Sequence, residues 1–218
     1  PVQLLEGPNV VEYPVVQATL TQRYTARALD FIERHAQQPF LLYLPHAMPH
    51  KPIAASEKFY KRSGAGLYGD VLAELDDSVG QVLDKLKSLG LDERTLVMFL
   101  SDNGAWFGGS TGGLRGMKGT AWEGGYRVPF LVRWPGHVPP NIVDNHLAIT
   151  MDIFATVLAA TGVSPPSDRV IDGKDLLPML NGKTSSVHDV TFAQNRQAAL
   201  ATAQDGQWKL HVLPQPEV

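Results

Sequence analysis

Cysteine is missing from this 218-residue sequence, and several kinds of site are excluded with it. Without a thiol, these residues form no disulfide framework, no thiolate zinc site and no cysteine nucleophile. Long apolar runs are missing too, because the longest are strand-sized and fall well short of the ~20 residues that span a bilayer. Positive charge is not in excess, since the formal net charge is −3. We therefore expect no nucleic-acid partner and no membrane association.

The remaining composition is that of an ordinary globular protein, with 44% hydrophobic and 19% charged residues. A chain of this length is sufficient for one domain with a core, or for one domain plus a small appendage. The first residue is Pro1 rather than Met, so we expect the natural N-terminus to lie upstream or to have been removed.

Hydrophobic periodicity predicts an α/β architecture. Apolar residues recur at spacings of three and four in residues 15–37 and 67–89, which predicts two helices. Continuous apolar runs at 40–45, 95–100 and 128–134 predict strands buried on both faces. Strands that alternate with helices favour a sandwich around a mostly parallel sheet.

The connecting segments complete this prediction. Residues 1–14 lack periodicity and are interpreted as a loop, and residues 146–160 as a short strand followed by a helix. Residues 104–125 are rich in glycine, and a long irregular loop inside a compact domain is usually functional. A hairpin is expected from strands at 197–202 and 208–212. We therefore predict an α/β domain over residues 1–187 and the start of a small antiparallel subdomain over 188–218.

Three polar clusters follow predicted strands, where sites collect in open α/β sheets. Asp102 and Asn103 offer hard oxygen ligands suited to Ca²⁺ or Mg²⁺, although on spacing alone an Asn-Gly turn capped by an aspartate is favoured. His50 lies in a proline-rich loop that could hold an imidazole rigidly towards an anion, or could be an inert surface loop.

The third cluster belongs to the glycine-rich loop. Lys118 would bring a point charge to an anion, and the glycines around it would let backbone approach a ligand closely. Glu123 and Arg127 are four residues apart and by default pair with each other or with neighbours.

In their order along the chain, these segments resemble the sulfatase family, in particular its arylsulfatase and N-acetylgalactosamine-6-sulfatase branch. Each motif is weak alone, but together they cover nearly the whole chain in the family order. The motifs are Phe40-Leu41-Leu42-Tyr43, His50-x-Pro52, Tyr68-Gly69-Asp70, Leu75-Asp76-Asp77-Ser78-Val79-Gly80, Ser101-Asp102-Asn103-Gly104, Leu114-Arg115-Gly116-Met117-Lys118-Gly119, Glu123-Gly124-Gly125-Tyr126-Arg127-Val128-Pro129, Trp134-Pro135-Gly136, Asp172-Gly173-Lys174-Asp175-Leu176-Leu177-Pro178 and Trp208-Lys209-Leu210.

The resemblance implies an alkaline-phosphatase-like fold, with a mixed sheet sandwiched by helices and a small C-terminal antiparallel sheet. It implies hydrolysis of a sulfate ester, such as an aryl sulfate or a sulfated sugar, by a formylglycine made from Cys or Ser. Asp102 and Asn103 match two calcium ligands of the family, and His50 and Lys118 match residues that contact the sulfate group. The resemblance also implies a periplasmic, secreted or lysosomal location, and it leaves the oligomeric state open.

The family's nucleophile motif and its two earlier calcium aspartates are missing here. We expect them upstream of Pro1, in an N-terminal half of the same domain, and we expect this chain alone to be inactive. Two alternatives stay open. One is a related phosphodiester or phosphonate hydrolase, which would be expected to show additional His and Asp metal ligands. The other is a non-catalytic module that binds an anion or a partner.

Overall fold

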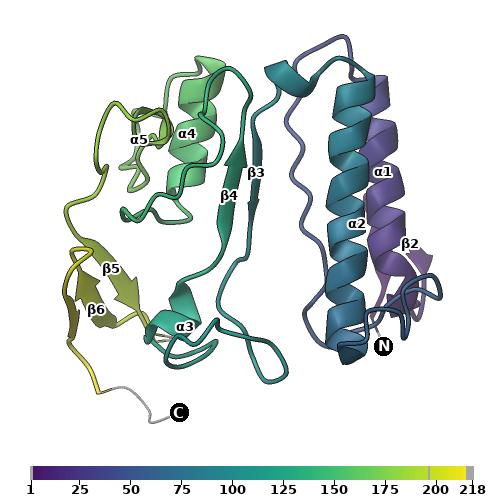
Figure 1. Ribbon diagram of the computed structural model, residues 1–218, viewed down its shortest axis with the longest axis horizontal. Helices are drawn as coiled ribbons and strands as arrows, with labels where there is room; N and C mark the ends of the chain where they lie inside the picture. Colours follow the sequence, from purple (N-terminus) through teal and green to yellow (C-terminus); the bar gives the residue numbers. More distant parts are fainter. Residues whose placement is uncertain (1, 196, 215–218) are drawn as a thin grey trace. The chain divides into compact units, whose positions relative to one another are not determined.

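A computed structural model describes residues 2–195 and 197–214 of the chain (Figure 1). The chain divides into two units, residues 1–95 and 96–218. Within the described residues, no helix combines the length and the apolar character that a membrane crossing requires.

The first unit opens with a hairpin where a loop was predicted. Strand β1 (Leu4–Glu6) pairs antiparallel with β2 (Asn9–Glu12). The chain reverses at Gly7, whose φ of +59° is accessible to glycine at little cost. The prediction missed this hairpin because its strands are too short for a period to register. A 3₁₀ turn, η1 (Gln17–Thr19), then leads into the first long helix.

Helices α1 (Leu20–Arg34) and α2 (Gly66–Ser88) confirm the two predicted helices and lie side by side in Figure 1. Thr25 of α1 contacts Ser78 of α2, and Glu33, which comes later in α1, contacts Lys85, which comes later in α2. The two helices therefore run parallel. A short 3₁₀ helix, η2 (Asp92–Arg94), follows α2. The apolar core of this unit gathers around Met48, Ala55 and Val71, with Phe59 packed against it.

Polar side chains fill part of the seam between α1 and α2. Thr25 Oγ1 donates to the Thr21 carbonyl (2.7 Å) and lies 2.6 Å from Ser78 Oγ. Thr25 and Ser78 are both buried, together with Glu74 and Asp70 of α2. The predicted α2 face therefore contains buried polar positions among its leucines and valines.

Residues 40–45 correct the prediction of a strand buried on both faces. The segment is extended, but it has no strand partner in the part of the chain that the structure describes. Leu41 and Tyr43 are 72% and 84% exposed. An extended segment buries both faces only when neighbouring strands and covering layers flank it, and no element in the described residues does so here.

The second unit contains β3 (Val97–Leu100) and β4 (Phe130–Arg133), which confirm two predicted strands. They pair antiparallel, with Phe99 opposite Leu131, whereas the sequence favoured a mostly parallel sheet. The parallel arrangement was inferred from the general alternation of strands and helices, but these two strands are joined by the irregular glycine-rich loop that the sequence predicted, with α3 (Glu123–Tyr126) near its end. Phe99 and Leu131 are both exposed, so this side of the strand pair is not covered.

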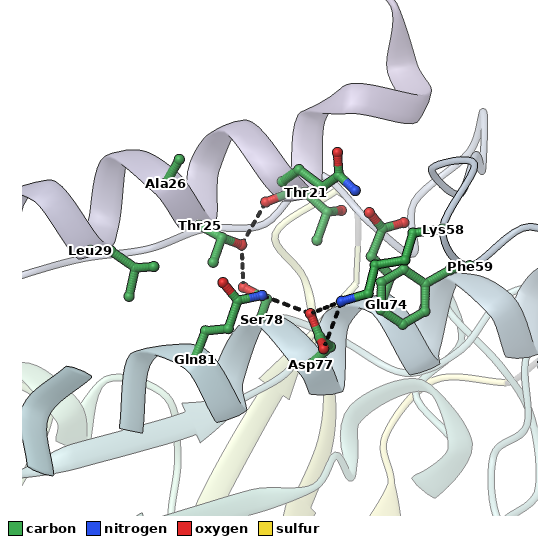
Figure 2. Close-up of a pocket in the computed structure, with 11 residues that line it drawn as sticks. Thr21, Thr25, Ala26, Leu29, Lys58, Phe59, Glu74, Asp77, Ser78 and Gln81 are labelled. Carbon is green, nitrogen blue, oxygen red and sulfur yellow. Dashed lines mark hydrogen bonds and ion pairs between the residues drawn. The ribbon is translucent and has the colours of Figure 1, made fainter. Parts of the chain in front are cut away.

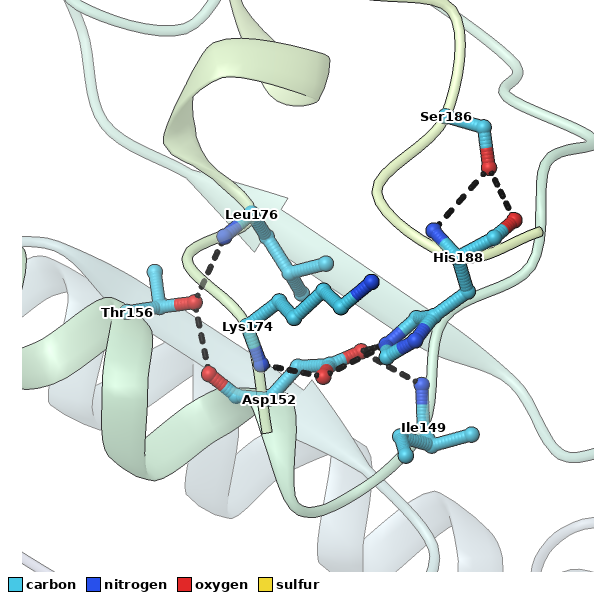
Figure 3. A network of polar contacts seen from close by, with 7 residues as sticks. All are labelled: Ile149, Asp152, Thr156, Lys174, Leu176, Ser186 and His188. Carbon is cyan, nitrogen blue, oxygen red and sulfur yellow. Dashed lines mark hydrogen bonds and ion pairs between the residues drawn. The ribbon is translucent and has the colours of Figure 1, made fainter. Parts of the chain in front are cut away.

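Helix α4 (Asp152–Thr161) is anchored by a buried network around its first residue (Figure 3). The Asp152 carboxylate, which is fully buried, accepts from the backbone N–H groups of Ile149 (2.7 Å) and Lys174 (2.8 Å). His188 Nε2 lies 2.8 Å from the same carboxylate. The network joins three segments distant in sequence, and it replaces the short strand predicted before α4, which the structure does not form.

The segment after α4 packs directly on the helix. A Cβ at Gly173 would lie 2.0 Å from the Met151 carbonyl oxygen, so only glycine fits there. Thr156 Oγ1 donates to the Asp152 carbonyl and accepts from the Leu176 N–H, and short helix α5 (Leu177–Leu180) follows.

The C-terminal sheet consists of β5 (Thr191–Gln194), β6 (Leu200–Gln204) and β7 (Lys209–His211), all antiparallel. The β6–β7 hairpin confirms the predicted one. It turns at Asp205, whose carboxylate accepts from the Trp208 and Gln207 N–H groups, which lowers the pKa of that carboxyl. Strand β5 was not predicted. The domain boundary at 187/188 stays a prediction, and residues 196 and 215–218 of that subdomain lie outside the described residues.

Candidate active site

Asp102 and Asn103 lie directly after β3, as predicted. Asn103 Nδ2 donates to Asp102 Oδ2 (2.6 Å), and Ser101 Oγ donates to the Asn103 carbonyl (2.9 Å). Asp102 is exposed and Asn103 is half-buried. These bonds orient the pair, and no residue in the described part of the chain donates to Asp102 Oδ1 or Asn103 Oδ1, so both oxygens are available to a cation.

The glycine loop, residues 104–125, folds back onto the end of β3. Gly104 N–H donates to the Gly125 carbonyl (2.9 Å), and Gly124 N–H donates to the Arg115 carbonyl (2.7 Å). A Cβ at Gly104 would lie 1.9 Å from the Gly124 carbonyl oxygen, and one at Gly124 would lie 2.3 Å from the Gly116 carbonyl oxygen. Backbone meets backbone at these points, which explains why the loop is rich in glycine.

This fold-back brings the Lys118 backbone near Asp102 and Asn103. Its backbone N–H donates to the carbonyl of Ala105 (2.9 Å), two residues beyond Asn103. The Lys118 side chain is half-buried and has no ion-pair partner among the residues that the structure describes. A lysine and two oxygen-bearing side chains therefore share one end of β3.

His50 lies in the first unit, at the end of the extended segment. It is exposed, and its Nδ1 donates to the Lys51 carbonyl (2.8 Å). A carbonyl oxygen only accepts, so this bond places a proton on Nδ1, and Nε2 is the ring nitrogen that the bond does not use. The other three predicted site residues belong to the second unit. The predicted meeting of His50 with Lys118 stays a prediction.

Glu123 pairs with a residue of the C-terminal sheet and not with Arg127. Its Oε1 lies 2.6 Å from Lys209 Nζ, and Arg127 contributes only a backbone bond to the Glu123 carbonyl. Beside this pair, the Trp122 ring packs at a tilt against His211, and burial together with Lys209 and Arg115 lowers the pKa of His211. No sequence pattern predicts a role for Lys209 or His211, although the motif Trp208-Lys209-Leu210 indicates this segment.

A polar pocket lies elsewhere, between α1 and α2 in the first unit (Figure 2). Lys58 pairs with Asp77 (3.2 Å) along its wall, and Gln81 donates to the same carboxylate (2.7 Å). None of the predicted site residues lines it. His46, outside the lining, has its Nε2 3.4 Å from Ser78 Oγ, and burial lowers the pKa of His46. The sequence predicted no catalytic or binding role for the residues that line this pocket.

Metal-ligating side chains are sparse. Within residues 2–195 and 197–214, no three His, Asp or Glu side chains gather closely enough to hold an ion by themselves. Asp102 and Asn103 supply oxygen donors of the type that calcium takes, but calcium requires about 6–8 ligands.

Comparison with known proteins identifies the family to which this protein belongs. The Sulfatase family profile matches residues 4–163, and the chain belongs to the sulfatase family. It is 45% identical over 205 residues to N-acetylgalactosamine-6-sulfatase of Mus musculus, covering 90% of this chain and 39% of that protein. It is 39% identical over 200 residues to steryl-sulfatase of Homo sapiens, covering 87% of this chain and 34% of that protein. The chain thus spans roughly two fifths of the length of the curated relatives it matches.

Solved structures agree with this assignment. The sulfatase PsFucS1 from Pseudoalteromonas sp. superposes with a TM-score of 0.85 at 30% identity, over 92% of this chain and 43% of that one. A sulfatase described in work on glycosaminoglycan metabolism by Bacteroides thetaiotaomicron superposes with a TM-score of 0.82 at 33% identity, over 89% and 43%. The predicted fold class, alkaline-phosphatase-like with a small C-terminal antiparallel sheet, is confirmed.

Proposed function

We propose that this chain is part of a sulfuric ester hydrolase and carries one side of its sulfate-binding and calcium-binding site. One observation carries the proposal: the glycine loop brings Lys118 to the end of β3 beside Asp102 and Asn103. A cation and hard oxygen ligands at one strand end suit a reaction whose transition state spreads negative charge over peripheral oxygens. Membership of the sulfatase family supports the ester class.

Calcium is the cofactor that these residues fit. Asp102 offers an exposed carboxylate, and the hydrogen bond from Asn103 Nδ2 leaves the Asn103 amide oxygen available. Carboxylate and carbonyl oxygens suit Ca²⁺ and are poor ligands for softer metals. When bound, the ion would supply positive charge beside the sulfate oxygens. We propose that the remaining ligands lie in the N-terminal half of the same domain.

Lys118 and His50 are assigned to the sulfate group. Lys118 is half-buried and has no carboxylate partner among the described residues, so its ammonium is available to an anionic oxygen. His50 has its Nδ1 proton committed to the Lys51 carbonyl, so Nε2 is the atom that can reach a substrate. When protonated, His50 Nε2 would donate to the leaving oxygen as the ester bond breaks.

The nucleophile, a formylglycine, is proposed to lie in the N-terminal half. Leu41 and Tyr43 on an unpaired extended segment, and Leu131 on β4, are exposed apolar side chains that such a half would cover. The greater length of the curated relatives supports the same proposal. Without that half, the chain would be inactive.

The substrate is proposed to be a sulfate ester of a sugar or of an aromatic alcohol. The relatives are named for different alcohols, N-acetylgalactosamine in one and a steryl group in another. Both relatives are named as sulfatases, and the residues assigned here would contact only the sulfate group of the substrate. The identity of the alcohol is therefore left to the test.

The test uses the full-length protein, assayed on an aryl sulfate and on an aryl phosphodiester. Turnover of the sulfate alone supports the proposal, preference for the phosphodiester favours the related hydrolase, and no turnover of either favours a non-catalytic module. Lys118→Ala and His50→Ala should each lower kcat about 10²–10³-fold, the loss typical of one charge-stabilising donor. Wild-type rates in both variants would refute the assignment. Peptide mapping should show a formylglycine upstream of Pro1.

Calcium binding is tested separately by titration calorimetry on the same protein. Asp102→Ala removes a carboxylate ligand and should raise the Kd for Ca²⁺ by at least about tenfold, which corresponds to about 1.4 kcal/mol of binding free energy. Asp144→Ala, whose carboxylate bonds His146 elsewhere in the second unit, is the matched control and should leave the Kd unchanged. Equal titrations for both variants would exclude Asp102 as a ligand.

A further inference from the structure

The glycine loop is held in place by the C-terminal sheet as well as by its own backbone. Glu123 Oε1, at the end of the loop, lies 2.6 Å from Lys209 Nζ on β7. The Lys209 side chain is only 16% exposed and that of Glu123 31%, so the pair is largely shielded from water. Exposed ion pairs contribute little, but this one is confined, and loss of one partner would leave a partly buried charge.

Three further contacts lie beside the ion pair. The Trp122 ring packs at a tilt against His211 of β7, with ring centroids 4.3 Å apart, and Arg115 Cζ lies 3.7 Å from the centre of the Trp122 ring. Tyr126 Oη donates to the carbonyl of Gln194 on β5 (2.6 Å). The C-terminal sheet therefore contacts the end of the loop and the short helix α3, which begins there.

Lys118 lies between the points that are held. The Arg115 carbonyl is bonded to Gly124 N–H, the Lys118 N–H to the Ala105 carbonyl, and Trp122 and Glu123 to β7. The Lys118 side chain makes no ion pair of its own in the described part of the chain. The position of its ammonium therefore depends on where the loop backbone is held.

We propose that Lys209 and Glu123 are positioning residues that set the location of the Lys118 ammonium through the glycine loop. The proposal rests on the proposed function, in which Lys118 contacts the sulfate group. Glu123 also neutralises the charge of Lys209. A misplacement of about 1 Å in such a group can lower turnover about 10²-fold, even when the change lies outside the site.

The experiment measures kcat and KM of the full-length protein on an aryl sulfate. Lys209→Met should lower kcat about 10- to 100-fold with KM changed less than about threefold. The reason is that the misplaced group, the Lys118 ammonium, acts on the transition state. Lys209→Arg keeps the charge and should recover most of the loss. Lys183→Met, at an exposed lysine of the same unit, is the matched control and should retain wild-type kcat.

A cycle with Lys118 separates positioning from general stability. In a Lys118→Ala background, Lys209→Met should lower kcat by less than about twofold, because no ammonium is left to position. An equal loss in both backgrounds would overturn the proposal, as would a Lys209→Met kcat within twofold of the Lys183→Met control. Circular dichroism on each variant shows whether it is folded. If Lys209→Met fails to fold, Glu123→Gln enters the same cycle with the same expectations.

The failures of the two proposals are distinguishable. If Lys118→Ala itself retains wild-type kcat, the assignment of Lys118 to the sulfate group fails. If Lys118→Ala loses activity while Lys209→Met and Glu123→Gln do not, the positioning proposal alone fails.

Discussion

At the residue scale, Asp70 shows how one buried carboxylate organises a connecting segment. Its two oxygens accept from the N–H groups of Ser63 (2.8 Å), Arg62 (3.0 Å) and Lys61 (2.7 Å). The bonds from Ser63, followed by those from Lys61 and Arg62, lower the pKa of the Asp70 carboxyl. The segment that enters α2 is thereby fastened to the first turns of the helix.

This arrangement predicts acid sensitivity. A carboxyl whose pKa is lower in the folded state stabilises the protein above its unfolded pKa, about 3.9, and that stabilisation is lost as pH falls through the folded value. Urea unfolding of the wild type between pH 7 and pH 3 should therefore lose stability towards the acid end. Asp70→Asn should be less stable at pH 7 and should lose less on acidification.

The control for Asp70 is Asp76, an exposed aspartate on the same helix. Asp76→Asn should follow the wild-type curve at every pH. Parallel pH curves for Asp70→Asn and the wild type would contradict the role given to the Asp70 carboxylate.

At the scale of elements, the close contact between Gly104 and Gly124 joins the end of β3 to the glycine loop. Gly104→Ala would place a Cβ 1.9 Å from the Gly124 carbonyl oxygen, so backbone must move. We expect a loss of about 1–3 kcal/mol in the free energy of unfolding, as for other overpacked sites. Urea denaturation measures it.

Gly80→Ala is the matched substitution, because its Cβ would meet no atom within 4 Å and the residue lies inside α2. It should stabilise the protein by about 0.5–1 kcal/mol through helix propensity. Equal effects of the two substitutions would show that the crowding at Gly104 is relieved without cost.

The same scale shows what could be predicted from sequence. The helix predicted at 67–89 is observed as Gly66–Ser88, because a long amphipathic period is a strong local signal. The run at 40–45 was predicted to be a buried strand and forms no strand in the structure, because apolar character does not show whether partner strands and covering layers are present in the chain. The Asp152–His188 contact spans 36 positions with no periodic signal, and it could not have been predicted.

The site assignments stay predictions. Asp102, Asn103 and Lys118 were proposed from strand ends and glycine content, and the backbone bond from Lys118 to Ala105 brings the Lys118 backbone near the end of β3. The partnership of Glu123 with Lys209 was missed, because helical spacing pointed to Arg127 and the two partners lie 86 positions apart.

At the scale of the whole molecule, the chain is a family member that spans 39% of the length of a 45%-identical relative and 43% of a solved sulfatase of the same fold. The candidate residues lie in both of its units, with His50 in the first and the other three in the second. Assignments for the complete site are therefore best tested in the full-length protein, in which both units and the proposed N-terminal half are present together.

The extended segment at 40–45 has a consequence for the behaviour of this polypeptide in solution. Leu41 and Tyr43 are 72% and 84% exposed on a segment that has no strand partner in the described residues, and such unpaired backbone is a template for pairing with another copy. If the chain is produced by itself, we expect concentration-dependent self-association, visible by light scattering. The double variant Leu41→Lys/Tyr43→Lys should reduce the self-association, since charges on unpaired backbone segments oppose strand pairing. Undiminished light scattering would show that the chain self-associates through a different surface. Low colloidal stability would then be a local property of one segment and not a sign of misfolding.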